Sequence, residues 1–216
     1  MAGARFSRGG AGGVIYAVAK RRDLGPIARL FAETFAERLE RAGARLPAPA
    51  LIEYSLRLFY DADPRSFLIA QLGADIAGCA FAPHPKSSLW RAAVMRGHAL
   101  RWLWQWPVGW RKTGLSPLRL MMAVQGQGEL PSAVWRSRNR SEARLLVVAV
   151  RPDMRGRGVG TRLVRHALQA WRHRGVQRVG LPLPADDETA RRLLLEVGFR
   201  EQAEAGQGWV LMVYDL

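Results

Sequence analysis

The chain has 216 residues, of which 49% are hydrophobic and 24% charged. These values are typical of a globular protein with a buried core, and they exclude a chain that is disordered throughout. The formal net charge of +15, from 33 basic and 18 acidic residues, favours anionic partners such as phosphorylated cofactors, lipid headgroups or nucleic acid. Because nearly all the basic residues are arginine in an alanine- and glycine-rich chain, codon composition is an alternative source of this charge.

One cysteine, Cys79, limits the redox and metal chemistry that the chain can carry out. It cannot form an intramolecular disulfide or a cysteine-based zinc site. Its place in an apolar, strand-like run predicts a buried, unreactive thiol rather than a nucleophile. Residues 1–12 have no apolar signal core, so we expect a flexible tail there and a cytoplasmic protein.

The first part of the chain predicts a strand, two helices and a hairpin. Residues 14–19 form an apolar run, and apolar residues recur at helical spacing from 24 to 43 and again from 49 to 60. Two apolar runs between 66 and 82 flank Gly73-Ala74-Asp75, which predicts a β-hairpin. The order expected up to this point is therefore β-α-α-β-β.

After an interruption, the second part of the chain alternates strands and helices. A buried strand is expected over 145–150, a second over 176–183, and two more on either side of Gly206. Two helices separate these strands, the later one ending at Gly198. The first helix has a continuous apolar face, made of Leu163, Val164, Ala167, Leu168 and Trp171. This order predicts an α/β domain with a mixed sheet.

The stretch VRPDMRGRGVGTRL at 150–163 joins the expected buried strand to this helix. Free N–H groups at the start of a helix, next to glycines that let the backbone approach a ligand, form an anion site. A dinucleotide fingerprint fails because Thr161 or Leu163 stands where its third glycine belongs, and a P-loop fails because no lysine precedes Thr161. A purely structural glycine turn is the alternative.

The same stretch resembles motif A of the GNAT N-acetyltransferase superfamily, whose signature R-x-x-G-x-G is met by Arg155, Gly158 and Gly160. The resemblance implies that the loop amides hold the pyrophosphate of acetyl-CoA. It also implies that main-chain groups of the preceding strand meet the pantetheine and the acetyl carbonyl. The cofactor-binding residues expected on this basis are Val148, Ala149, Val150, Arg155, Gly156, Arg157, Gly158, Val159, Gly160, Thr161, Asp187, Ala190 and Leu194.

The segment 186–199 resembles motif B of the same family, N-x-x-A-x-x-L-Y-x-x-x-G-F. It departs from that pattern at two positions. Asp187 replaces an asparagine that often contacts the cofactor, and Leu194 replaces a tyrosine that often protonates the leaving thiolate. The matching residues are Ala190, Leu193, Gly198 and Phe199. A plain amphipathic helix is the alternative interpretation of this segment taken alone.

The resemblance implies a GNAT fold: an α/β domain over 13–216 with a mixed, mostly antiparallel central sheet flanked by helices. A tryptophan- and arginine-rich insertion at about 84–143 precedes the cofactor strand. Arginines interrupt its segment 86–114 too often for a transmembrane span. A lid or a subunit contact is favoured there over a peripheral membrane contact, because the arginines do not share one helical face.

The implied reaction is direct transfer of acetyl from acetyl-CoA to an amine, which needs a base to accept the amine proton. Glu142 is the candidate catalytic residue, with a solvated surface charge as its alternative role. Glu129, His84 and His98 are weaker candidates for the base, and the spacing of ligand-type residues indicates no metal site.

The acceptor expected is a small-molecule or sugar amine. A protein or peptide amine is one alternative, and a non-catalytic CoA-binding or membrane-associated module is another. A homodimer and a membrane-peripheral location remain open. Nucleic acid is disfavoured as a partner because the arginines are spread along the chain and no nucleic-acid-binding module is recognisable.

Overall fold

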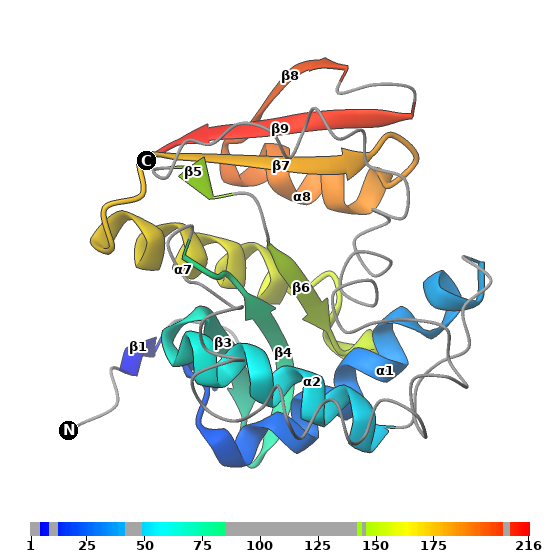
Figure 1. The fold of residues 1–216 in the computed structure, drawn as a ribbon, viewed down its shortest axis with the longest axis vertical. Helices are drawn as coiled ribbons and strands as arrows, with labels where there is room; N and C mark the ends of the chain where they lie inside the picture. The colour runs from blue at the N-terminus through cyan, green and yellow to red at the C-terminus, as the bar shows by residue number, and fades with distance from the viewer. Residues whose placement is uncertain (1–4, 9–12, 42–48, 85–141, 144–145, 205–207) are drawn as a thin grey trace.

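The computed structural model describes residues 5–8, 13–41, 49–84, 142–143, 146–204 and 208–216, which form two sheets (Figure 1). The first sheet has five strands in the order β1-β2-β3-β4-β6, all antiparallel. Its strands are β1 (Arg5–Arg8), β2 (Val14–Val18), β3 (Phe67–Leu72), β4 (Asp75–Phe81) and β6 (Val147–Val150). β6 is therefore an edge strand, with β4 as its neighbour.

The second sheet has four strands in the order β5-β7-β9-β8. The pair β5–β7 is parallel, whereas β9 pairs antiparallel with both β7 and β8. The bounds are β5 (Glu142–Ala143), β7 (Arg178–Pro184), β8 (Arg200–Glu204) and β9 (Trp209–Asp215). Antiparallel pairs predominate in both sheets, as the sequence predicted.

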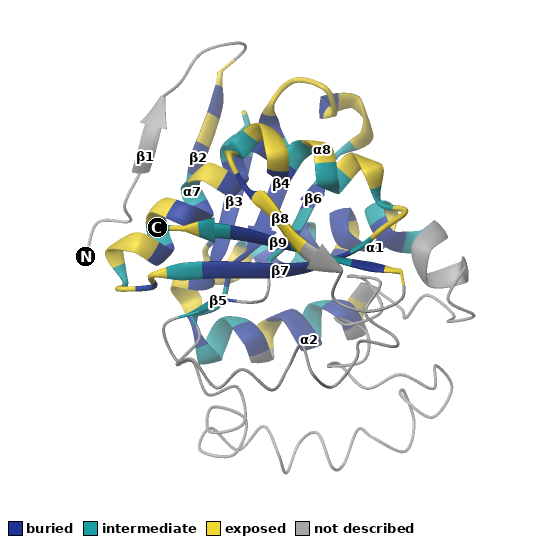
Figure 2. Ribbon diagram, turned by 90° about the horizontal axis from the view of Figure 1, so that it is seen from above, coloured by how far each residue is buried: buried dark blue, intermediate teal, exposed yellow. Residues whose placement is uncertain are grey.

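Helices cover the first sheet on both faces. α1 (Leu24–Arg41) and α2 (Pro49–Ala62) pack on one face, in a core with Phe67, Ile69 and Phe81. α7 (Val159–His173) packs on the other face and shares a second core with residues of β7 and β9. Buried positions follow one side of α7 and most of β3 and β4 (Figure 2). They include all five residues of the predicted apolar face of α7.

α8 (Glu188–Val197) follows β7 and packs against α7. Its contact with α7 is close, because a Cβ added to Gly160 would lie 2.9 Å from Leu193 Cδ1. A side chain at position 160 would push against α8, so glycine suits the helix contact as well as the loop. Leu194 is the residue of α8 that is fully buried, and the rest of the helix is largely accessible.

Most expected elements are confirmed, with two differences in the first sheet. Arg5–Arg8 lie within the segment expected to be a tail, but they form β1 and pair with β2. The strand expected from 145 is described from Val147. Of the insertion, 85–141 lies outside the described residues, including the segment 86–114 on which the lid and membrane hypotheses rest. Within the described ranges, no helix has the length and apolar character needed to cross a membrane.

Candidate functional site

The chain from Glu142 to Val150 changes sheets, and this opens a cleft. Glu142 and Ala143 pair with β7, whereas Val147–Val150 pair with β4. β6 and β7 therefore belong to different sheets, and a cleft of about 830 Å³ lies between them. The start of α7, the glycine loop, α8 and two residues of α1 complete its lining.

The edge of β6 that faces away from β4 pairs with no other strand among the described residues. The N–H of Arg151 donates to the carbonyl of Ala77 at 3.0 Å, and this bond shows which residues of β6 form hydrogen bonds with β4. In an antiparallel pair, alternate residues bond to the partner strand, so Ala149 bonds to β4 opposite Cys79. Val148 and Val150 direct their N–H and C=O groups toward the cleft, and both line it.

This hydrogen-bond pattern corrects the expectation that Ala149 binds the cofactor. Its main-chain groups are used within the sheet, its side chain is buried among residues of α1 and α2, and it does not line the cleft. β6 also runs in unbroken register with β4 over Val147–Val150.

β7 forms the opposite wall. The N–H of Ala185 donates to Gly208 O, and that of Leu216 to Gln177 O, both at 2.9 Å. Odd-numbered residues of β7 therefore bond to β9, and the main-chain groups of Gly180 and Pro182 face the other edge. Pro182 has no N–H, so at this position the edge presents a carbonyl acceptor and no donor. The cleft-lining residues of β7 are Leu181, Pro182 and Leu183.

Two glycines of the loop have backbone conformations that favour glycine. Gly156 and Gly158 have φ of 71° and 73°, and an added Cβ at either would meet no atom within 4 Å. Gly158 is the N-cap of α7, and having no side chain it makes no capping hydrogen bond. The first intrahelical bond runs from Arg162 N to Gly158 O, at 3.1 Å. The amides that precede Arg162 are the donors that bind anions at a helix N-terminus.

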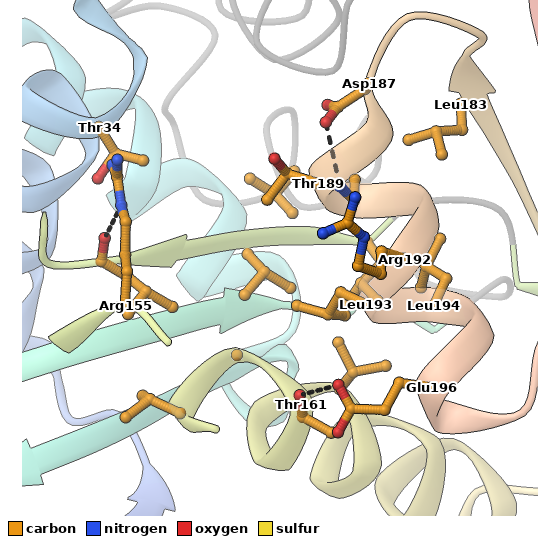
Figure 3. A pocket seen from close by; sticks show the side chains of 18 of the residues that line it. Thr34, Arg155, Thr161, Leu183, Asp187, Thr189, Arg192, Leu193, Leu194 and Glu196 are labelled. Carbon is orange, nitrogen blue, oxygen red and sulfur yellow. Dashed lines mark hydrogen bonds between the residues drawn. The ribbon is translucent and has the colours of Figure 1, made fainter. Parts of the chain in front are cut away.

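The two arginines of the loop differ in position. Arg155 lines the cleft beside Thr34 of α1, and its Nε donates to Val150 O at 3.3 Å (Figure 3). Arg157 is exposed and does not line the cleft, contrary to the expectation that it contacts the cofactor. The other loop and helix residues expected to bind cofactor, Gly156, Gly158, Val159, Gly160 and Thr161, all line the cleft.

The α8 wall contains the motif B residues. Asp187 is the N-cap of the helix, and its Oδ1 accepts from Ala190 N at 3.1 Å (Figure 3). Asp187, Ala190 and Leu194 line the cleft as expected. Leu194 is 5% exposed and has no proton to donate, so the position that corresponds to the tyrosine of the motif B pattern is apolar here.

Glu142, the candidate base, lies outside the cleft lining. Its side chain packs over the β7 backbone, because a Cβ at Gly180 would be 2.5 Å from Glu142 Oε1. This contact places the Glu142 carboxylate against the β7 backbone, and its role as the base stays a prediction. His84 is also engaged in contacts within the fold. Its main-chain N–H donates to Asp63 Oδ2 at 3.2 Å, and its ring Nε2 lies 3.1 Å from Arg174 O. Glu129 and His98 lie outside the described residues.

Several cleft residues were not predicted. Thr34 and Phe35 of α1 line it, and Thr34 Oγ1 is enclosed with no hydrogen-bond partner among the described residues. Glu188, Arg192 and Glu196 form a stripe along α8 at i, i+4 and i+8, a spacing that the sequence contains. The α1 and β7 residues have no such signal, because the fold alone brings them to the cleft.

Cys79 is buried, as its apolar surroundings in the sequence predicted. Burial raises the pKa of the Cys79 thiol to about 12, which outweighs the opposing effect of a hydrogen bond with the Ala149 backbone. A thiol that stays protonated near neutral pH is a poor nucleophile. No group of three or more His, Cys, Asp or Glu residues suited to a metal ion occurs in the described part of the chain.

Comparison with known proteins gives one family. The model of the acetyltransferase (GNAT) family matches residues 29–199. An uncharacterized N-acetyltransferase of Methanocaldococcus jannaschii is 35% identical over 74 residues, which is 34% of this chain and 32% of that protein. The mycothiol acetyltransferase of Clavibacter sepedonicus is 31% identical over 87 residues, which is 40% of this chain and 29% of that protein. The chain thus matches less than a third of the length of either relative.

Solved structures share the fold at low sequence identity. The ribosomal-protein-alanine N-acetyltransferase from Brucella melitensis has a TM-score of 0.57 and 16% identity, with 93% of this chain and 99% of that chain covered. A putative acetyltransferase from Salmonella typhimurium, solved with its cofactor acetyl-CoA, has a TM-score of 0.55 and 15% identity, with 94% and 92% covered. With the family match over 29–199, we conclude that the chain belongs to the GNAT family of acetyltransferases.

Proposed function

We propose that the protein transfers the acetyl group of acetyl-CoA to the amine of a small-molecule or sugar acceptor. The observation that carries the proposal is the free edge of β6, which leads into the open glycine loop and the uncapped start of α7. An extended amide chain can bond to such an edge, and an anion to such a helix start. Coenzyme A has both features, an amide-containing pantetheine arm and a pyrophosphate, joined in that order.

Main-chain groups of β6 and the glycine loop suit this ligand. The N–H and C=O of Val148 and the N–H of Val150 face the cleft and suit the amides of the pantetheine. The positive φ of Gly156 and Gly158 and the open space beside them suit a pyrophosphate approaching the amides of α7. When bound, acetyl-CoA supplies a thioester that an amine can attack.

The reacting end of the cleft is apolar. Leu146, Val148, Leu181, Leu183 and Leu194 surround the place where β6 and β7 separate. Exclusion of water there would strengthen the hydrogen bond from a main-chain N–H to the developing oxyanion. The carbonyl edge at Pro182 suits an N–H of the incoming amine.

Two measurements test the function. Acetyl-CoA is expected to raise the thermal unfolding temperature by mass action, and a panel of amines is expected to include one that causes release of free CoA thiol. Small-molecule amines, amino sugars and peptides with free N-termini form separate groups in the panel, so the panel also tests the protein-acetylation alternative. No thermal shift at millimolar acetyl-CoA would refute the cofactor assignment.

Leu194 favours a second candidate function, a CoA-binding module without catalysis. If the absent proton donor limits turnover, Leu194→Tyr should raise kcat by up to about a hundredfold, the lower end of general acid effects. Leu194→Phe is the matched control, because it adds the ring without the hydroxyl. Thiol release by the wild type supports the enzyme, whereas tight CoA binding with no release by the wild type or Leu194→Tyr with any acceptor supports the binding module.

A further inference from the structure

We propose that Arg192 binds a phosphate of the donor and exchanges its ion pair with Glu188 for this contact when coenzyme A binds. The inference rests on the proposed function and deepens it, because it adds a side-chain phosphate ligand on the wall opposite the glycine loop. The residue falls in a variable position of motif B, where the sequence pattern assigns no role.

α8 carries two neighbouring arginines with different surroundings. Arg191 donates from Nε and Nη2 to the two carboxylate oxygens of Glu201 on β8, a bidentate contact that ties α8 to the second sheet. Arg192 lines the cleft instead, with a side chain that is 84% exposed. Arg191 is therefore engaged within the fold, while Arg192 is accessible to a ligand in the cleft.

The existing partner of Arg192 is weakly bound. Its Nη2 lies 3.5 Å from Glu188 Oε2, and the Glu188 side chain is 70% exposed. An exposed i, i+4 pair of this kind contributes little to stability, since water screens both charges. A phosphate offers the guanidinium a shorter, charge-assisted and often bidentate contact, so exchange of Glu188 for phosphate is favourable.

The distribution of charges around the cleft indicates that Arg192 can attract a phosphate. The lining contains two arginines, Arg155 and Arg192, and the acidic residues Asp187, Glu188 and Glu196. Asp187 caps α8, and Glu196 accepts a hydrogen bond from Thr161 at 3.4 Å. Arg155 lies below α1 and Arg192 projects from α8 on the other side of the opening (Figure 3). Among the described residues of the lining, Arg192 is thus the cation on the α8 side.

The experiment compares Arg192→Ala with the matched control Arg191→Ala by calorimetric titration of coenzyme A. Arg192→Ala should weaken binding about five- to tenfold, the loss of one exposed charge-assisted contact, while Arg191→Ala should stay within about twofold of wild type. Glu188→Gln should tighten binding in the wild type and have no effect in the Arg192→Ala background, because it acts by releasing Arg192.

Two further ligands identify the phosphate. Pantetheine has none, so Arg192→Ala and wild type should bind it equally. Dephospho-CoA lacks the 3′-phosphate. If Arg192→Ala and wild type bind dephospho-CoA equally, Arg192 contacts the 3′-phosphate. If Arg192→Ala still binds dephospho-CoA more weakly, Arg192 contacts the pyrophosphate. Equal affinity of Arg192→Ala and Arg191→Ala for coenzyme A would overturn the inference. Failure of the wild type to bind coenzyme A would instead refute the proposed function.

Discussion

The two ends of α7 are built in opposite ways. At its C-terminal end, Arg174 Nη2 donates to the buried carboxylate of Asp63 at 2.8 Å, and Trp171 Nε1 donates to Pro83 O at 3.1 Å. His84 Nε2 lies 3.1 Å from the carbonyl of Arg174. At its N-terminal end, the N-cap Gly158 lies in the left-handed region and makes no side-chain capping hydrogen bond.

This difference indicates that the C-terminal end of α7 holds the helix in place, while its N-terminal end binds the ligand. The C-terminal end is joined to the α2–β3 connection and to the end of β4, so the helix has a fixed position on the sheet. The amides at the N-terminal end then keep a fixed direction toward the cleft. A helix end that its own chain leaves without side-chain caps is available to a ligand. We therefore expect changes at one end to affect ligand affinity and changes at the other end to affect stability.

The largest expected effect on donor affinity is that of Gly158→Ala. Alanine at this positive φ costs about 1 to 2 kcal/mol in folding free energy. Its Cβ also occupies space that a phosphate needs beside the helix amides. We expect the Kd for coenzyme A to rise at least about tenfold, the equivalent of 1.4 kcal/mol or more, measured by calorimetric titration.

Gly175→Ala is the matched control at the opposite end of the same helix. Gly175 has φ of 75°, against 73° for Gly158, and an added Cβ would meet open space at both positions. The two variants should therefore lose similar stability, while Gly175→Ala keeps its affinity for coenzyme A. Equal losses of affinity would mean that the effect of Gly158→Ala comes from strain and not from the cradle.

The second expected effect concerns stability at the C-terminal end. Asp63→Ala leaves Arg174 and the N–H of His84 without their carboxylate partner. Because Asp63 is 6% exposed, we expect a loss of about 2 kcal/mol in unfolding free energy, reduced from the value for a fully buried pair by the partial exposure of Arg174. Urea unfolding measures this loss.

The affinity of the folded Asp63→Ala variant for coenzyme A should be close to that of wild type. Asp153→Ala is the control, since it removes a carboxylate that pairs with Arg151 at the surface. A large loss of affinity in Asp63→Ala would show that the two ends of α7 are coupled, and the separation of support from binding would be wrong.

The same division explains how much the sequence could predict. Glycine spacing and a strand–loop–helix order are local, so the loop at 155–161 and the helices on either side of β7 could be predicted. The phase of β6 could not. It depends on the register with β4, and this register turns Ala149 into the sheet while Val148 and Val150 face the cleft. β1 was missed because Arg5–Arg8, which pair with β2, do not themselves form an apolar run.

Side-chain roles in the site were predicted less well, for the same physical reason. Glu142 precedes the cofactor strand in the sequence, but pairing of β5 with β7 places its carboxylate over Gly180. Arg191 and Arg192 are adjacent in the sequence and differ only in which face of α8 they occupy. The stripe Glu188, Arg192 and Glu196 could have been found from helical spacing, whereas its contact with the cleft depends on the packing of α8 against α7.

The smallest expected effect lies between the two ends, at His166, whose ring packs on Tyr16 at a centroid distance of 5.0 Å. Burial, and secondly the charge of Arg162, lower the pKa of His166 below its usual 6.5. In the unfolded chain this histidine takes up a proton near pH 6.5, whereas the folded protein resists protonation. This contribution to stability is therefore fully present above pH 6.5 and is lost as the pH falls below it toward the lowered folded value.

His166→Phe keeps an aromatic ring against Tyr16 and removes the titrating group, so it tests this pH dependence directly. We expect the urea midpoint of the wild type to fall more between pH 7 and pH 5.5 than that of the variant, by an amount small beside the effects of Gly158→Ala and Asp63→Ala. The side chain faces β2 rather than the cleft, so coenzyme A should bind both proteins equally. An equal fall of the two midpoints would show that the titration of His166 does not contribute to the pH dependence of stability.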